Sequence, residues 1–478
     1  MVDILFINPV NKHGNYGQCP PLGIASVASY MKRKGISVKI IDYAIENPSV
    51  SQLVSKYNPS IIHLEDIMFK SSGTRFECFR IAEEIKHVNP GITIIYAGTH
   101  ATFTPEDTLK NIPEIDFIIR GEAEQTLLEL TKYILKGETY FRDIKGISFR
   151  FAGKIVNNPE RERLENLDES KIDYSLIDVS KYKIKFDHDM KALQLVTSRG
   201  CTSGCTFCVN GAMWGPGHGK RTVKSVVDEI EFLNSEYGIE GIKFFDINLA
   251  QDKTHIIELC RELKERNLGI TWNCRTRADM LNRDFLNMLK SAGGYKASFG
   301  LESASPRIMK QINKNISLLQ VEKVLDNMKS LDMHTNMFFL YGLPNETMKD
   351  AFMTYKFIRK NLYRTTEIVG NIVNIYPGTY VEKFAFEKGF MPKGFSWSKH
   401  WVNPDYVSGV HCSPFVPPLI QPYFTHEQMM EIMRETNRER ISLSLLRKKI
   451  PDIGTEKGVI SSAKRLVKTI QFRTGGAK

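Results

Sequence analysis

The sequence predicts an α/β protein with an N-terminal, doubly wound, Rossmann-like parallel sheet, a partial (β/α)6 barrel related to the TIM barrel, and a mostly helical C-terminal extension. Three observations lead to this prediction. Short apolar segments alternate with amphipathic helical segments over residues 1–150. A polar stretch then interrupts the alternation, and six further strand-helix units follow it. At 478 residues the chain also exceeds the size at which one hydrophobic core usually stops growing.

The first alternation predicts the N-terminal sheet over residues 1–150. Amphipathic segments such as residues 76–88 separate the apolar runs, which is typical of a parallel sheet with helices on both faces. Ligands of such sheets bind beyond the carboxyl ends of the strands. The strand candidates are residues 3–10, 38–44, 60–66, 92–98 and 116–122.

Residues 151–190 are polar and charged, which predicts a connector between domains. The second alternation covers residues 191–395 and predicts an open barrel. Its strand candidates are residues 193–199, 242–248, 270–276, 295–302, 334–342 and 372–377.

Residues 396–478 form the extension, and its end predicts a basic amphipathic helix. The apolar face comprises Val459, Ile460, Ala463, Val467 and Ile470, and the basic residues away from it are Lys457, Lys464 and Lys468. Such a helix either docks on the barrel or makes peripheral contact with a membrane surface or an acidic partner. Aromatic residues and histidines before it, Trp397, His400, Trp401, Tyr406, His411 and Phe415, either contact a substrate or pack the mouth of the barrel.

The composition predicts an ordinary globular, cytoplasmic protein, with 42% hydrophobic and 25% charged residues. The N-terminus does not resemble a secretory signal, and no apolar run approaches the roughly 20 residues that span a bilayer. Eight cysteines without such a signal favour metal binding over a disulfide framework. The net charge of +11 suits nucleic acid, a membrane surface or an anionic substrate and does not distinguish them.

Three of the cysteines, Cys201, Cys205 and Cys208, follow a predicted strand with the spacing C-x-x-x-C-x-x-C. Gly204 lets the loop fold tightly. Soft thiolate ligands suit iron–sulfur chemistry, and three of them on a four-iron cluster leave one iron open for a small molecule. A structural zinc site is the alternative, but neither His218 nor a later cysteine has the usual spacing of a fourth ligand.

This loop, with aromatic Phe207 before its last cysteine, resembles that of the radical S-adenosylmethionine (SAM) enzymes. The resemblance implies that the three cysteines hold a [4Fe-4S] cluster, that SAM binds the open iron, and that its cleavage gives a 5′-deoxyadenosyl radical. It also implies an electron donor such as flavodoxin or ferredoxin. Later strand ends resemble the cobalamin-binding branch of the family, although Asn248 departs from the acidic pair usual there. The implied SAM contacts are Phe207, Asp246, Arg277, Glu302, Gly342 and Pro377.

The N-terminal half resembles the cobalamin-binding domain that precedes many of these barrels. The implied cobalamin contacts are Leu22, Gly23, Asp42, Gly98, His100, Gly121 and Glu122. The D-x-H-x-x-G pattern is absent, since neither His63 nor His100 stands in it. We therefore expect cobalamin to bind without a protein histidine on cobalt; a purely scaffolding sheet is the alternative.

The paired domains imply a cobalamin-dependent radical SAM methyltransferase acting on an unactivated carbon, in which one SAM yields the radical and a second restores the methyl group carried by cobalamin. The alternatives are a cyclase or rearrangement enzyme of the same branch, and a non-catalytic iron–sulfur or corrinoid sensor. RNA methylthiolation is disfavoured because those relatives usually add three N-terminal cluster cysteines, so we expect no nucleic acid. The expected substrate is a small or lipid-like molecule or a peptide, and no catalytic residue of the chain itself is assigned. Cys78 and Cys260 are expected to be buried, hydrophobic-like residues.

Overall fold

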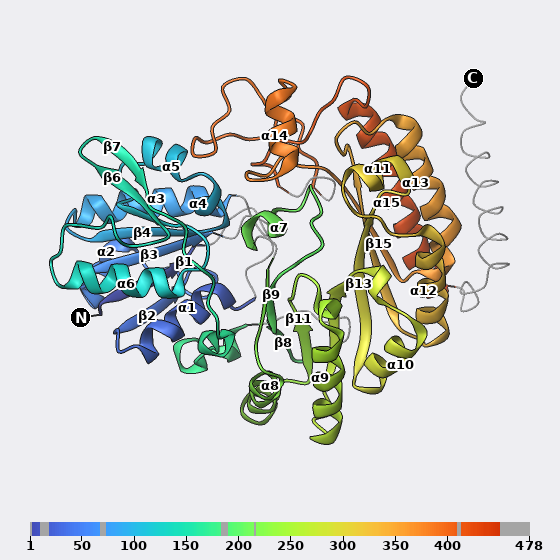
Figure 1. Cartoon of the computed structure of the whole chain (residues 1–478), viewed down its shortest axis with the longest axis horizontal. Coiled ribbons are helices and arrows are strands. Elements are labelled where there is room, and N and C mark those ends of the chain that lie inside the picture. The colour runs from blue at the N-terminus through green and yellow to red at the C-terminus, as the bar shows by residue number, and fades with distance from the viewer. Residues whose placement is uncertain are drawn as a thin grey trace. The chain divides into compact units, whose positions relative to one another are not determined.

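The computed structural model describes residues 2–9, 19–66, 73–182, 190–214, 217–408 and 413–449, with only the backbone of 438–449. The chain divides into two compact units. The first comprises residues 1–275 and 374–419, and the second comprises residues 276–373 and 420–478. Figure 1 shows the strands and helices of both along the chain.

A seven-stranded sheet forms the N-terminal part of the first unit, in the order β2-β1-β3-β4-β5-β6-β7. The first five strands are parallel, and β6 and β7 add an antiparallel hairpin that crosses residue 150, where we expected the connector to begin. The direction of strand succession reverses between β1 and β3, so a ligand crevice is expected beyond the ends of these two strands. The strands are β1 (Ile4–Asn8), β2 (Val38–Asp42), β3 (Ile61–Asp66), β4 (Thr93–Gly98), β5 (Phe117–Ile119), β6 (Ile147–Phe151) and β7 (Lys154–Asn157).

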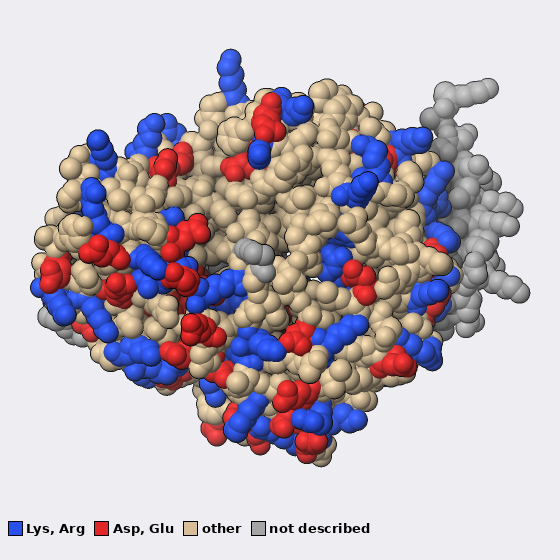
Figure 2. All heavy atoms as spheres, in the orientation of Figure 1, with Lys and Arg blue, Asp and Glu red and all other residues tan. Residues whose placement is uncertain are grey.

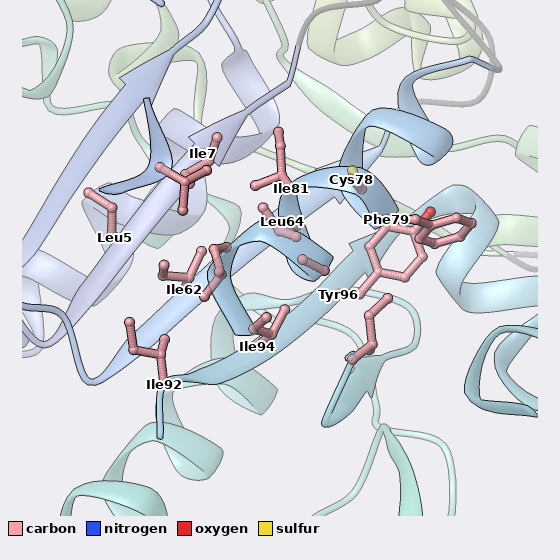
Figure 3. Packing of buried hydrophobic residues seen from close by; sticks show 14 of the residues in the cluster. Leu5, Ile7, Ile62, Leu64, Cys78, Phe79, Ile81, Ile92, Ile94 and Tyr96 are labelled. Atoms are coloured by element: carbon pink, nitrogen blue, oxygen red, sulfur yellow. The ribbon is translucent and has the colours of Figure 1, made fainter. Parts of the chain in front are cut away.

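Helices cover both faces of this sheet: α1 packs beside α6, and α2 packs beside α3 (Figure 1). Figure 3 shows the apolar side chains of β1, β3 and β4 packed against α3, with Cys78 and Phe79 among them. Cys78 is fully buried, as is Cys260 on α9, which confirms both as small core residues. The helices are α1 (Leu22–Arg33), α2 (Val50–Tyr57), α3 (Thr74–Val88), α4 (Thr99–Phe103), α5 (Pro105–Asn111) and α6 (Glu124–Leu135).

The described part of the connector, up to Tyr182, makes polar contacts with elements on both of its sides. Its three short 3-10 turns cover residues 167–170, 174–176 and 179–181. The Tyr182 hydroxyl donates to Asp42 at the end of β2, at 2.8 Å. On the other side, the buried Tyr174 hydroxyl donates to Glu229 of α8, at 2.6 Å. The connector therefore joins the N-terminal sheet to the first barrel helix.

The first half of the barrel completes the first unit. Strand β11 lies between β8 and β12 and is parallel to both. A short antiparallel pair, β9 and β10, follows β8 and flanks the cysteine loop. The elements are β8 (Ala192–Leu195), β9 (Ser198–Gly200), α7 (Val209–Trp214), β10 (His218–Lys220), α8 (Val223–Tyr237), β11 (Gly241–Phe244), α9 (Lys253–Glu265) and β12 (Thr271–Thr276), with α14 (Tyr380–Glu387) later in the chain.

The second unit holds three further parallel strands, with β14 between β13 and β15. The predicted fold class is thus confirmed, but the position of the sixth barrel strand was wrong: β15 ends at Ile372, where the predicted strand began. The apolar run at 372–377 misled the prediction, whereas Gly370 weakens the strand signal. A Cβ at Gly370 would lie 3.1 Å from the sulfur of Met433, so glycine makes room for α15. The elements are α10 (Arg283–Ser291), β13 (Gly294–Glu302), α11 (Pro306–Gln311), α12 (Leu318–Ser330), β14 (His334–Tyr341), α13 (Met348–Asn361), β15 (Glu367–Ile372) and α15 (His426–Lys449).

Residues 374–419 return to the first unit and pack on the N-terminal sheet. Buried Arg75 of α3 donates to the backbone oxygens of Trp397 (2.9 Å) and Phe415 (2.8 Å). These two aromatic residues are buried and serve packing. His411 and the predicted basic helix at 457–470 lie outside the described residues.

Basic and acidic side chains are interspersed over the face drawn in Figure 2, so the net charge of +11 is not gathered into one patch there. Among the described residues, no helix is both long and apolar enough to cross a lipid bilayer.

Candidate functional site

The cysteine loop runs from Cys201 to Cys208, between β9 and α7. Gly200, the residue before it, has φ +95°, and a Cβ there would lie 2.2 Å from the Gly217 oxygen. Only glycine therefore lets β9 approach the segment before β10. Gly204, inside the loop, also has a positive φ of +63°, which confirms the expected tight fold.

The loop leaves its three thiols available for ligation. Cys201, Cys205 and Cys208 are partly exposed, and none forms a disulfide. A backbone hydrogen bond from Cys208 to Cys205 (3.2 Å) closes the C-x-x-C turn. Among the described residues, no three His, Cys, Asp or Glu side chains converge as ligands of a single metal ion. Each cysteine of a cubane cluster binds a different iron, so such a cluster does not need three thiols that converge on one point. That these three cysteines hold a cluster stays a prediction.

Asp246 lies just beyond the end of β11 and is almost fully buried. Its carboxylate accepts hydrogen bonds from the Thr197 hydroxyl (2.7 Å) and the Ser198 hydroxyl (2.6 Å), and also from the Thr197 amide. Burial raises the pKa of Asp246 above its ordinary value, although these hydrogen bonds oppose the shift. The structure thus places Asp246 as a clamp on the segment that leads to Cys201; its contact with SAM stays a prediction.

Arg199 connects the same segment to the N-terminal sheet. Its guanidinium donates to Glu124 of α6 (2.6 Å) and to the Ser26 hydroxyl of α1 (3.2 Å), and it stands over the Trp214 ring. Burial raises the pKa of Glu124, but the Arg199 charge outweighs burial, so the pKa lies below its ordinary value. Sequence reasoning missed this ion pair, because nothing in the sequence indicates that residues 75 positions apart meet.

Pro377 is buried in a turn that contacts both the N-terminal sheet and the cysteine loop. Gly378, with φ +76°, lies so close to Phe103 of α4 that a Cβ would come within 2.2 Å of its ring. Two residues later, the Tyr380 amide donates to the Thr206 oxygen, at 3.2 Å. Phe207, the next residue in the loop, is half-buried.

In the second unit, Glu302 ends β13 in a strained backbone conformation, with φ +67°. Its carboxylate forms an ion pair with Lys314 (2.8 Å) that is almost fully buried. The side chain folds back over Gly300, where a Cβ would lie 1.9 Å from Oε1 of Glu302. Strand pairing shifts register at this point, which is how a β-bulge redirects a side chain.

Gly342 follows β14 with φ +84°, and both its amide and its carbonyl oxygen form hydrogen bonds. The Gly342 and Leu343 amides donate to one oxygen of buried Glu346, at 2.6 and 3.0 Å, and Gln421 donates to the Gly342 oxygen. Burial raises the pKa of Glu346 to about 8. Glu346 and Gln421 were not predicted, although an acid four residues after a glycine turn is a usable signal.

Arg277, the remaining residue predicted to contact SAM, forms a two-point ion pair with Asp279, at 3.0 and 2.8 Å. The guanidinium plane is therefore fixed by a residue of the same turn.

Two of the predicted cobalamin contacts are held by protein partners. Asp42 is buried and accepts hydrogen bonds from Asn8 (2.8 Å) and from Tyr182 (2.8 Å). Burial nevertheless keeps the pKa of Asp42 above its ordinary value. Glu122 accepts a hydrogen bond from the Leu164 amide, at 2.7 Å. Both carboxylates therefore hold the ends of their strands in place.

His100 is fully buried, with Trp397 near its ring, and burial together with Arg75 holds its pKa well below the ordinary value. His63 is also fully buried. Neither ring has a hydrogen-bond partner among the described residues, and the same holds for one carboxylate oxygen of Asp66. Asp66 and His100 lie at the carboxyl ends of β3 and β4, at the edge of the sheet where a ligand is expected, whereas His63 lies in the middle of β3.

At the remaining predicted cobalamin contacts, backbone atoms are the groups that a ligand could approach. Leu22 and Gly23 begin α1, and Gly121 lies after β5; all three are partly exposed. Gly98 has φ +108°, and a Cβ there would lie 2.1 Å from the Asp66 oxygen. Among the described residues, this edge of the sheet offers small residues and polar atoms but no accessible imidazole, as expected for a corrinoid bound without a protein histidine.

Two family models match the chain: one described as a B12 binding domain, over residues 15–131, and one described as the radical SAM superfamily, over residues 195–358. An uncharacterized methyltransferase of Pyrococcus horikoshii is 30% identical over 420 residues, which cover 87% of this chain and 86% of that protein. The anaerobic magnesium-protoporphyrin IX monomethyl ester cyclase of Rubrivivax gelatinosus is 30% identical over 369 residues, 74% of this chain and 65% of the cyclase.

Among solved structures, the radical SAM methyltransferase TsrM of Kitasatospora setae, determined with tryptophan and a SAM analogue, has a similar fold. The TM-score is 0.66 at 17% sequence identity, over 90% of this chain and 82% of TsrM.

Proposed function

Since the chain belongs to the cobalamin-binding radical SAM enzymes, we propose that it is a methyltransferase that acts on an unactivated carbon of a small molecule. The main support comes from the first unit. There, the Arg199–Glu124 ion pair joins the three-cysteine loop to the sheet that the B12-binding model matches. The methyltransferase name of the Pyrococcus relative and the fold shared with TsrM support it.

When bound, a [4Fe-4S] cluster with SAM supplies a 5′-deoxyadenosyl radical, and cobalamin supplies a carrier for the methyl group. In the proposal, Cys201, Cys205 and Cys208 each bind one iron. Asp246 and Arg199 hold the segment before Cys201 from two sides, so that the thiols keep their spacing.

For SAM, the proposed contacts are Phe207, Asp246, Arg277, Glu302, Gly342 and Pro377. Their roles follow from their local geometry: Lys314 orients the Glu302 carboxylate, Asp279 fixes the Arg277 plane, and Glu346 sets the turn at Gly342. Such supporting contacts pre-organise a site and reduce the entropy lost on binding.

For cobalamin, we propose that Leu22, Gly23, Gly98 and Gly121 let the corrinoid approach the backbone, with Asp42, His100 and Glu122 shaping the strand ends beneath it. Because His63 and His100 are fully buried, neither imidazole is expected to reach cobalt. The corrinoid should therefore bind without the spectroscopic signature of a histidine ligand.

The test is to follow the fate of SAM in anaerobically purified, reconstituted protein with a chemical reductant. A methyltransferase of this kind uses SAM in two ways, so both 5′-deoxyadenosine and S-adenosylhomocysteine should form, the latter only when cobalamin is supplied. Formation of 5′-deoxyadenosine with no cobalamin-dependent S-adenosylhomocysteine would contradict methyl transfer.

A second candidate is a cyclase of the same branch, which the 30% identity to the Rubrivivax cyclase favours. Cyclisation needs the radical and no methyl donor. The two functions therefore separate in the same experiment, since a cyclase forms no S-adenosylhomocysteine and its product gains no methylene.

We also propose that a flavodoxin or ferredoxin donates the electron and that the enzyme works in the cytoplasm, where cysteines stay reduced. A membrane contact through the basic residues after 456 is a further proposal. Reduction of the reconstituted protein by purified flavodoxin, and sedimentation with anionic vesicles, test these two partners.

A further inference from the structure

Arg275 has a placement that the cofactor sites do not explain. On β12 the buried residues Trp272, Cys274 and Thr276 alternate with Asn273 and Arg275, which therefore lie on the opposite face of the strand. Arg275 is the exposed residue of this strand, near its carboxyl end. Ligands of parallel α/β sheets and barrels bind at that end.

The neighbouring strand contributes to the same face. In the parallel register of β11 and β12, Lys243 pairs with Asn273. Asn273 lies two residues before Arg275 on the same face of β12, so Lys243 is a second basic residue close to Arg275 on that face. Phe245, two residues after Lys243, stands under the guanidinium, with the Arg275 Cζ atom 4.9 Å from the ring centroid. This stacking fixes the plane of the guanidinium and leaves its N–H edges for another partner.

The charge of Arg275 is not compensated within the described residues, where no carboxylate forms an ion pair or hydrogen bond with it. Three other arginines of the same unit do form ion pairs: Arg199 with Glu124, Arg221 with Glu229, and Arg266 with Asp228. Burial lowers the pKa of Arg275 with no acidic side chain opposing the shift, so the surrounding protein partly desolvates the group. A guanidinium stays protonated, so its exposed part presents a positive charge with which an anion can pair.

We propose that Arg275 binds an oxyanion, the carboxylate or phosphate group of a small molecule held at this end of the barrel strands. This inference rests on the proposed function, because it assumes that the reaction takes place there. The planar fork of arginine matches both groups with two parallel hydrogen bonds. The oxyanion comes either from the substrate or from the carboxylate of SAM, and the test distinguishes these sources.

The test measures how fast phenylglyoxal, an arginine reagent, labels individual residues of the anaerobic, reconstituted protein, by peptide mass spectrometry. The probes are inorganic phosphate, SAM, decarboxylated SAM, and chloride at matched ionic strength. Arg142 is the internal control, because it is exposed and also stacks on a phenylalanine, Phe151, at 5.0 Å. Its labelling should be the same with every probe.

We expect a bound oxyanion at about four times its dissociation constant to slow Arg275 labelling about fivefold by mass action. Protection by phosphate and not by SAM assigns the site to a substrate anion, whereas protection by SAM and not by decarboxylated SAM assigns it to the SAM carboxylate. Equal labelling with all probes, or parallel slowing of Arg142, would overturn the proposal. Labelling of Arg275 does not depend on methyl transfer, so a failure of the anion proposal does not contradict the proposed methyltransferase function. In the same way, absence of S-adenosylhomocysteine would contradict methyl transfer but not anion binding by Arg275.

Discussion

The guanidinium of Arg199 lies 2.6 Å from the carboxylate of Glu124, and this ion pair joins the strand before the cysteine loop to the first turn of α6. The Glu124 side chain is only 2% exposed, and Glu122 lies farther from the guanidinium, at 3.7 Å. The N-terminal sheet and the cysteine loop are thus held together by an ion pair that is largely shielded from water.

Replacing Glu124 by Ala should destabilise the protein by about 3 kcal/mol, because it leaves the Arg199 charge buried without its partner. Urea unfolding at neutral pH measures the loss. The control is Glu162→Gln, which breaks a pair of equal length with Lys145, also 2.6 Å, whose side chains are 74% and 46% exposed. An exposed pair contributes at most about 1 kcal/mol. Equal effects of the two substitutions would show that Glu124 and Arg199 are not coupled as described.

Asp246→Asn should lower the iron content after anaerobic reconstitution and destabilise the protein by about 2 kcal/mol. Asparagine keeps the volume of the side chain but turns an N–H toward the donors of Thr197 and Ser198, so hydrogen bonds are lost on the segment before Cys201. The control is Asp228→Asn on the surface of α8, which should bind the normal amount of iron. A normal iron content in the Asp246 variant would contradict its role as a clamp.

Gly300→Ala should weaken SAM binding about tenfold, which corresponds to about 1.4 kcal/mol. The added Cβ occupies the place of the Glu302 carboxylate, 1.9 Å from its Oε1, and forces that group away from its position beside Lys314. Equilibrium dialysis with reconstituted protein measures the dissociation constant. Gly91→Ala, where the nearest atom is 3.2 Å away, should bind SAM like the unchanged protein. An unaltered affinity in the Gly300 variant would remove Glu302 from the proposed SAM contacts.

Glu346 should make stability depend on pH. Its pKa is raised from 4.5 to about 8 by burial, so between these values the folded protein binds more protons than the unfolded chain. Stability therefore falls as the pH rises through this window. Glu346→Gln cannot titrate, so the thermal midpoint of the unchanged protein minus that of the variant should decrease from pH 5 to pH 9. A difference that is constant across this range would show that Glu346 does not titrate in the window.

The sequence predicted the elements that carry strong local signals. The cysteine spacing located the loop. Ten of the eleven proposed strands largely coincide with strands of the structure, because apolar runs between amphipathic helices leave little choice, and the eleventh shares only Ile372 with β15. Strand β15 was misplaced because Gly370 lowers its strand signal, and that glycine is explained by Met433 and Thr436, two residues far along the chain.

The partners of the site residues could not be predicted, since they depend on tertiary contacts. That Asp42 and Glu122 contact cobalamin stays a prediction, but their protein partners, the Tyr182 hydroxyl and the Leu164 amide, became known only from the structure. Arg275 received no role from the sequence, because its isolation from carboxylates is a property of the folded strands. Motifs identify which residues matter, and the fold decides what each of them touches.

The central claim is that Cys201, Cys205 and Cys208 hold the cluster at which SAM is cleaved. The most direct measurement is 5′-deoxyadenosine formation by each Cys→Ala variant after anaerobic reconstitution, with iron and bound corrinoid quantified in the same samples. Cys260→Ala, in the core of α9, is the control for loss of a thiol. We predict that the three loop variants lose iron and SAM cleavage while still binding corrinoid, and that the control retains all three properties. SAM cleavage by any loop variant would contradict the claim.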